Sequence, residues 1–220
     1  MNAGLSRRRL LLVLAVVVLC CCVVVTGERL WTRHRVDWWL DHAYPIFTDL
    51  VTDERLHFST LGEWQAAGQR IPRVVPTLTD QFSSANDSRK VLLLYGLGAA
   101  SGDDAYRFLV TVGQSSSESD EVRHAAFGYG VGQYVDRPEW RARILSGIRK
   151  RDFPLDWCCI YLASLIRLGD LGAQQYATAD GLQLLSDAQS DGASADAGRI
   201  LSRALSERGH SKVQKEKHNR

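Results

Sequence analysis

The chain has 220 residues, 45% of them hydrophobic, and a formal net charge of +2, so its length allows one ordinary domain together with an anchor and a tail. Its ends are basic: residues 1–35 carry +5 and residues 206–220 carry +3, which leaves −6 for the body between them. Coating a nucleic acid requires a continuous basic face, and we therefore expect no nucleic-acid partner.

A basic segment, 1–9, precedes sixteen consecutive apolar residues at 10–25. With its flanks, this run reaches the lower limit of the roughly 17–25 residues that a membrane-spanning helix needs. We predict a transmembrane or signal-anchor helix over 10–27 that contacts the lipid bilayer. A cleaved secretory signal, cut after Gly27, is the alternative, because such signals also combine a basic start with an apolar core.

Basic residues flank the apolar run on both sides. Arg7, Arg8 and Arg9 precede it, and three more arginines follow between positions 29 and 35. The tighter first cluster and the start-methionine amine favour a cytoplasmic N-terminus. We therefore expect a single-pass membrane protein whose body lies outside the cytoplasm.

Residues 28–68 are predicted to form juxtamembrane helices and a degenerate first repeat. The first of these helices is rich in tryptophan, with Trp31, Trp38 and Trp39. Aromatic rings of this kind sit well among lipid headgroups. Packing of the same rings beneath the first repeat is the other interpretation.

A series of helix pairs is predicted beyond residue 43, with the repeat domain over 69–205. Apolar residues recur at helical spacing, and polar turns separate the segments. The expected helices cover 45–51 and 53–64, 71–82 and 91–97, 104–112 and 120–134, 139–150 and 155–168, and 174–185 and 195–205. The basic tail, 206–220, lacks an apolar stripe and is predicted to be disordered.

The pair between 71 and 103 is the clearest. Its first helix carries one apolar stripe, and its second, 91–97, is almost wholly apolar and is therefore expected to be the buried, inner helix. Between them, the polar turn at 83–88 supplies side-chain oxygens that can cap the second helix. A spacing of 34 residues relates Gly98, Gly132 and Ile166, as expected of stacked helix pairs.

Three motifs resemble those of HEAT-like (PBS-lyase-type) helical repeats. They are Pro-Arg-Val-Val-Pro-Thr-Leu at 72–78, Asp-Glu-Val-Arg-His-Ala-Ala at 120–126 and Ser-Leu-Ile-Arg-Leu-Gly-Asp at 164–170. The resemblance implies an all-α, right-handed α-solenoid of about four helix pairs. It also implies that Arg123 and Arg167 bridge neighbouring repeats.

Three glycines, Gly128, Gly130 and Gly132, depart from the family pattern inside one predicted inner helix. Each costs about 0.5–1 kcal/mol relative to alanine. The glycines either allow close helix packing or shorten the helix.

Glycines at 96–102 offer a different interpretation. Residues 91–95 followed by Gly96, Gly98 and Ser101 resemble the start of a dinucleotide-binding unit. Such a unit needs further strands that alternate with helices, and no such alternation follows. A helix that ends at Gly98 or Gly102 is the favoured interpretation.

No catalytic or metal-binding constellation is predicted. The six histidines are scattered, without His-x-x-x-His spacing, and neither a metal nor a cofactor is expected. Cys20, Cys21 and Cys22 lie in the apolar run, whereas Cys158 and Cys159 are expected to pack as small hydrophobic residues.

One dense basic cluster stands out in the acidic body. We predict that it binds a partner of opposite charge, either an acidic protein or lipid headgroups; a solvated, partly neutralised helix face is the alternative. The candidate residues are Arg141, Arg143, Arg149, Lys150 and Arg151.

Taken together, these features predict a membrane-tethered, non-enzymatic scaffold that uses a helical-repeat surface to bind another protein. Two alternatives remain. One is a nucleotide- or cofactor-binding enzyme built on the glycine-rich segment 96–102. The other is a structural subunit of a membrane complex.

Overall fold

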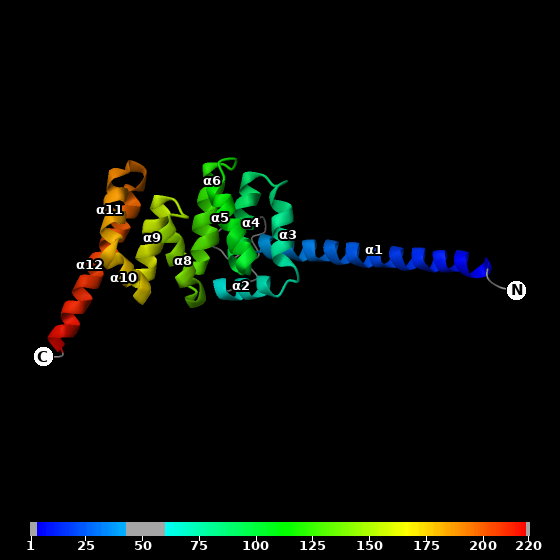
Figure 1. The fold of residues 1–220 in the computed structure, drawn as a ribbon, viewed down its shortest axis with the longest axis horizontal. Coiled ribbons are helices and arrows are strands. Elements are labelled where there is room, and N and C mark those ends of the chain that lie inside the picture. Colours follow the sequence, from blue (N-terminus) through cyan, green and yellow to red (C-terminus); the bar gives the residue numbers. More distant parts are fainter. Residues whose placement is uncertain (1–3, 43–59, 219–220) are drawn as a thin grey trace. The chain divides into compact units, whose positions relative to one another are not determined.

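The computed structural model describes residues 4–42 and 60–218, and every regular element in these two ranges is a helix (Figure 1). The predicted all-α class is therefore confirmed for this part of the chain. The predicted helix over 45–51, and most of that over 53–64, lie outside the described residues. Two compact units divide the chain, Met1–Asp80 and Gln81–Arg220.

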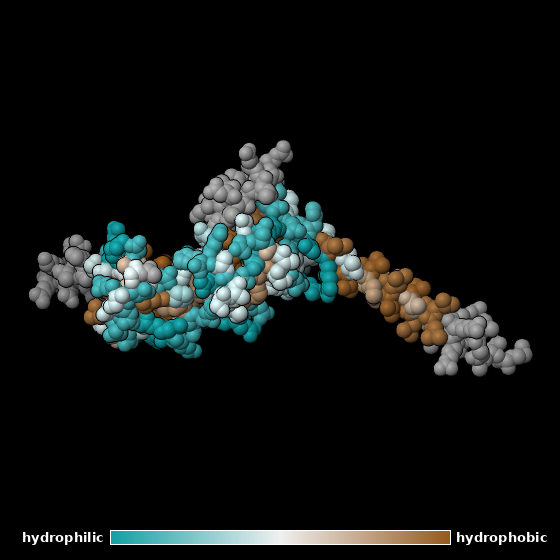
Figure 2. All heavy atoms as spheres, turned by 90° about the horizontal axis from the view of Figure 1, so that it is seen from above, coloured by the Kyte–Doolittle hydropathy of each residue, from teal (hydrophilic) through white to brown (hydrophobic). Residues whose placement is uncertain are grey.

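Unit 1 begins with one long helix, α1 (Gly4–Asp41), which contains a stretch long and apolar enough to cross a membrane. Its side chains are exposed throughout 11–30, and they form the apolar band seen along α1 in Figure 2. The helix continues through residue 27, where the predicted membrane segment ends, because no proline or cap interrupts it there. Instead, the Thr26 hydroxyl donates a hydrogen bond to the Cys22 carbonyl inside the helix (2.7 Å).

Two tryptophans join α1 to α2 (Leu61–Gln69). The Trp39 and Trp64 rings stack with their centroids 4.5 Å apart. Each indole N–H also donates to the other residue's carbonyl, at 2.9 and 3.0 Å. Both side chains are almost fully buried, whereas Trp31 and Trp38 remain about half exposed. Trp39 therefore packs inside the protein, whereas Trp31 and Trp38 face outward.

The third helix, α3 (Val74–Phe82), begins three residues later than predicted. Arg73 has a left-handed backbone (φ 54°), which a continuing α-helix does not accommodate. Next, α4 (Asp87–Ala100) starts at the predicted cap, where the Asn86 side chain accepts a hydrogen bond from the Arg89 N–H (2.9 Å). All ten residues at 91–100 are buried, which confirms the predicted inner helix.

The predicted helix over 120–134 is present, but its middle winds more loosely. After α5 (Asp103–Gln114), the chain forms α6 (Asp120–Ala125), a π-helical turn η2 (Ala126–Val131) and α7 (Gly132–Val135). A π turn shifts backbone carbonyls out of the α-helical pattern. Two such carbonyls accept side-chain hydrogen bonds: Phe127 from the Tyr161 hydroxyl (2.7 Å) and Tyr129 from Gln133 (2.6 Å).

Close helix packing explains the glycines of this segment. A Cβ on Gly130 would overlap the Leu109 side chain of α5, and one on Gly128 would lie 2.9 Å from the Trp157 ring. Against α4, a Cβ on Gly98 would lie 2.7 Å from the Gly130 carbonyl oxygen. The first of the two predicted explanations is therefore confirmed at Gly128 and Gly130.

The C-terminal part of unit 2 differs from the prediction at two places. The predicted helix over 174–185 is two helices, because Asp180 leaves the α-helical conformation between them. In addition, the last helix includes residues 206–218, where a disordered tail is predicted; its Lys, Glu, Gln and Arg residues favour helix. The elements are α8 (Pro138–Lys150), α9 (Leu155–Arg167), α10 (Leu171–Ala179), α11 (Gly181–Ser190), η3 (Gly192–Ser194) and α12 (Ala195–His218).

Helices of unit 2 follow one another in chain order along the body (Figure 1). Each predicted inner helix contacts the next: α4 packs on η2, and α9 packs on α12. Between them, η2 and α9 meet through side chains, since the Tyr161 hydroxyl donates to the Phe127 carbonyl, and α7 also contacts α9. Between α9 and α10, Gly169 takes the left-handed backbone (φ 76°) that ends a helix, and the Asp170 side chain then caps α10 through the Ala173 N–H (2.8 Å).

We expect the substitution Tyr161→Phe to lower the free energy of unfolding of unit 2 by about 0.5–1.5 kcal/mol, because the buried Phe127 carbonyl would lose the Tyr161 donor and keep only the Gly132 N–H. Urea denaturation of the full chain measures this loss. Tyr129→Phe, at an exposed side chain, is the control and should change stability by less than about 0.5 kcal/mol. Equal effects of both substitutions would contradict a specific role for the Tyr161 hydroxyl.

Candidate functional site

The five predicted basic residues do not form one surface. Arg143 lies over two aromatic rings, 4.5 Å from the Tyr106 centroid and 5.2 Å from that of Trp140. Its guanidinium also pairs with Asp103 at 2.5 Å. These contacts join α8 to α5, and they leave Arg143 engaged within the protein. Arg141 is half-buried, and its Nε atom is enclosed without a hydrogen-bond partner among the described residues.

Arg149 and Arg151 do come together, at the end of α8. They line an open pocket of about 440 Å³ with Tyr176, Asp180 and Gln183. The Arg149 guanidinium lies 5.5 Å from the Tyr176 ring centroid, on α10. We refer to these five residues as the Arg149 pocket.

The two arginines of the pocket differ in what they contact. Arg151 has a left-handed backbone (φ 58°) at the C-terminal cap of α8, and its guanidinium pairs with Asp187 of α11 at 2.7 Å. Arg149 makes no ion pair within the described residues, and it is exposed, as is Lys150. The positive charge that is open to a partner is therefore that of Arg149 and Lys150.

Tyr176 and Gln183 are pocket residues that the sequence did not single out. Burial raises the pKa of the Tyr176 hydroxyl, while the nearby Arg151 opposes this shift. The hydroxyl therefore stays protonated at neutral pH and can donate a hydrogen bond, as can the Gln183 amide. Both residues follow the basic cluster by about 30 residues in the chain. The 34-residue period is the sequence signal that could have placed them beside Arg149.

Arg137 has a structural role. Its Nη2 atom donates to the Gly98 and Ala99 carbonyls at 3.1 and 3.4 Å, which satisfies the C-terminal end of α4. Its side chain also lies over the Tyr134 ring (5.1 Å), and burial lowers its pKa. The last carbonyls of a helix need hydrogen-bond donors from elsewhere, but the sequence alone does not indicate that Arg137 supplies them to α4.

The HEAT resemblance implies that Arg123 and Arg167 each contact a neighbouring repeat. Arg167 forms its ion pair with another helix, and Arg123 forms its ion pair within its own. Arg167 of α9 lies 3.5 Å from the Glu207 carboxylate of α12. Arg123, by contrast, pairs with Asp120 on its own helix. Arg167 thus joins two helices, whereas the Arg123 ion pair stays within one helix.

The glycine-rich segment does not form a phosphate-binding loop. Gly96 and Gly98 lie inside α4 and are buried, in a stretch where the alternative interpretation needs a strand followed by a loop. Gly98 instead allows the close approach of η2.

The paired cysteines lie in the core, as predicted. Burial raises the pKa of the Cys158 thiol to about 11 and that of Cys159 to about 12. Both thiols are therefore protonated at neutral pH, the opposite of what a nucleophile requires. No group of three or more metal-ligating side chains occurs among the residues that the structure describes.

Comparison with known proteins gives no relative: no family model, curated protein or solved structure matches the chain. The resemblance to HEAT-like repeats therefore stays a prediction.

Proposed function

We propose that the chain is a membrane-tethered, non-enzymatic scaffold that binds an acidic segment of another protein through Arg149 and Lys150. The observation that carries this proposal is the Arg149 pocket, where an unpaired arginine, an aromatic ring and two uncharged donors lie together at the surface. Asp180 is its one carboxylate, and the pocket's two arginines together with the exposed Lys150 outnumber it. Carboxylates are the natural partners of this combination, because guanidinium groups bind them with charge-assisted hydrogen bonds.

A right-handed α-solenoid of about four helix pairs is the architecture we propose for this scaffold. In its support, the Tyr161 hydroxyl donates a hydrogen bond to the Phe127 carbonyl, which lies one 34-residue period earlier in the chain. The Arg167–Glu207 pair and the packing of α9 on α12 similarly join consecutive pairs. Stacked pairs bury a continuous core and leave an extended surface on which a partner can bind.

For the tether, we propose that α1 crosses the bilayer once, with the N-terminus in the cytoplasm and the repeat domain, 69–205, outside. The exposed apolar side chains at 11–25 support this assignment, because water is a poor solvent for such a surface. Trp31, exposed and close to the end of the apolar run, suits the headgroup region, where aromatic rings are enriched.

The test is affinity capture of the full chain, at neutral pH, from membranes that have been solubilised in a neutral detergent. We expect the double substitution Arg149→Glu and Lys150→Glu to reduce the amount of co-purified acidic partner at least fivefold, because both accessible charges are reversed. Arg143 is left intact, since its reversal would disturb the contacts with Asp103 and Tyr106.

A second double substitution, Arg107→Glu with Arg199→Glu, is the matched control. It reverses two charges at exposed arginines on α5 and α12, away from the pocket. The control should retain the partner. Equal loss with both doubles would point to net charge, and no loss with either would refute the proposed surface.

A further inference from the structure

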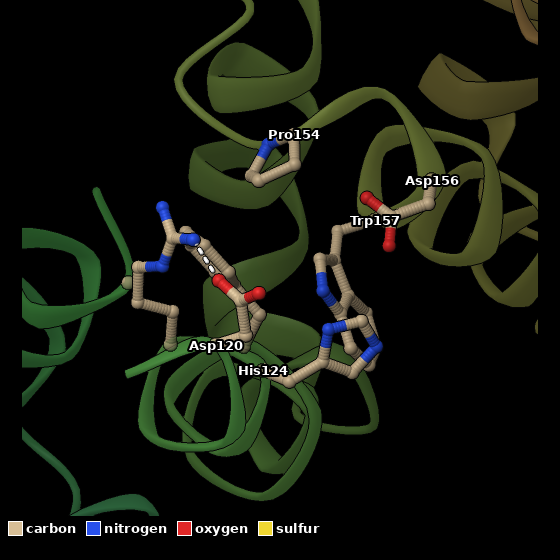
Figure 3. Close-up of a pocket in the computed structure, with 8 residues that line it drawn as sticks. Asp120, His124, Pro154, Asp156 and Trp157 are labelled. Carbon is tan, nitrogen blue, oxygen red and sulfur yellow. Dashed lines mark hydrogen bonds and ion pairs between the residues drawn. The ribbon is translucent and has the colours of Figure 1, made fainter. Parts of the chain in front are cut away.

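A second pocket lies on unit 2, between α6 and the start of α9 (Figure 3). Its volume is about 320 Å³. Asp120 and His124 come from α6, whereas Pro154, Asp156 and Trp157 come from the α8–α9 turn and the first turn of α9. This pocket shares no residue with the Arg149 pocket, and we refer to it as the Trp157 pocket.

Trp157 forms a fixed aromatic wall of this pocket. Its ring contacts those of His124 (centroids 5.1 Å apart), Tyr161 (5.6 Å) and Phe127 (6.4 Å). Gly128 also leaves room for the indole, because a Cβ there would lie 2.9 Å from it. The indole is nevertheless only half-buried, so part of its surface remains open.

The charges around the pocket are unequal. Arg123 is paired with Asp120, so these two residues offset each other. Asp156 is half-buried and makes no ion pair within the described part of the chain. Figure 3 shows its carboxylate beside Trp157. The net charge of the ionised lining groups is therefore negative, and it is concentrated next to the indole.

We propose that the Trp157 pocket binds the side-chain cation of an arginine or lysine in a basic peptide segment of a partner protein. A cation that lies on the indole face is attracted by the negative face of the ring, a cation–π interaction. In the same position it meets the unpaired Asp156 carboxylate, which provides a charge-assisted hydrogen bond. An anion would instead be repelled by the Asp156 carboxylate, and Arg123, the lining's arginine, already has a partner in Asp120.

The proposal gives the scaffold two surfaces of opposite preference: the Arg149 pocket for carboxylates and the Trp157 pocket for cations. The second does not depend on the first, because the residues are separate. Failure of either test therefore leaves the other proposal standing.

The experiment measures binding of a peptide that carries fluorescein on its N-terminal amine, fluoresceinyl-Gly-Arg-Gly-Arg-Gly-amide, to the full chain in neutral detergent micelles by fluorescence anisotropy. A second peptide carries citrulline in place of arginine, which keeps the shape and removes the charge. We expect saturable binding of the arginine peptide, and binding at least fivefold weaker for the citrulline peptide. Asp156→Asn should weaken binding of the arginine peptide at least fivefold.

Asp87→Asn is the matched control, because Asp87 is also an acidic residue in the first turn of an inner helix but lies on α4, outside the pocket. It should bind the arginine peptide as the unmodified chain does. Circular dichroism checks that both variants keep their helix content. Equal binding of the two peptides, an unchanged affinity in Asp156→Asn, or an equal loss in Asp87→Asn would each overturn the proposal.

Discussion

Replacement of Trp64 by alanine is expected to release α2 from α1 and to cost about 3–5 kcal/mol of local stability. The side chain is fully buried against Trp39, and its removal leaves a large cavity. It also leaves the Trp39 carbonyl without its indole donor. Hydrogen exchange of the α2 amides in the full chain measures the effect, and we expect exchange to become about 100-fold faster or more.

Trp31→Ala is the control for this prediction. Trp31 lies on the same helix as Trp39, but about half of its surface is exposed. Its replacement should leave exchange in α2 within about twofold of the unmodified chain, because few packed atoms are lost. Comparable acceleration in both variants would mean that α2 depends on α1 as a whole, and that the tryptophan pair has no special part.

Gly98→Ala is expected to lower the free energy of unfolding of unit 2 by about 1–2 kcal/mol. The added Cβ would lie 2.7 Å from the Gly130 carbonyl oxygen and 2.9 Å from that of Tyr129. Both atoms belong to the backbone and cannot rotate away, so α4 and η2 must separate. Overpacking of this kind costs about 1–3 kcal/mol and occasionally more, against a gain of about 1 kcal/mol from the better helix propensity of alanine. Urea denaturation measures the balance.

Gly132→Ala provides a matched comparison, one 34-residue period later in the chain. There the nearest atom to the added Cβ is the Phe127 carbonyl oxygen at 3.4 Å, an ordinary contact. This substitution should be neutral or stabilise the protein by up to about 1 kcal/mol. If Gly98→Ala proved equally neutral, the close approach of α4 and η2 would be refuted.

Much of the helical framework can be predicted from the sequence, because the apolar spacing and the caps are local signals. The stretch at 91–100 is buried as its composition predicts, and Asn86 caps it as the polar turn predicts. Interruptions without a glycine or proline are harder to predict. The left-handed backbone of Arg73 delays the start of α3, and the non-helical backbone of Asp180 divides α10 from α11. Neither residue type indicates such a backbone conformation in advance.

The candidate site is less accessible to sequence analysis, since charge alone does not reveal a side chain's partners. Arg143 and Arg149 are six residues apart on one helix, yet the first is engaged by Asp103 and Tyr106 and the second is open. The difference between the two arginines comes from contacts with residues far away in the chain, which the local sequence does not show. The Trp157 pocket is still less visible, because it depends on the distance between α6 and α9.

The continuity of α1 has a mechanical consequence. A single helix of 38 residues, about 57 Å long at 1.5 Å per residue, carries both the apolar run and Trp39. A helix without a hinge transmits rotation about its own axis from one end to the other. Any turn or tilt that lipids impose on the apolar run would therefore reach Trp39, and α2 would move with it.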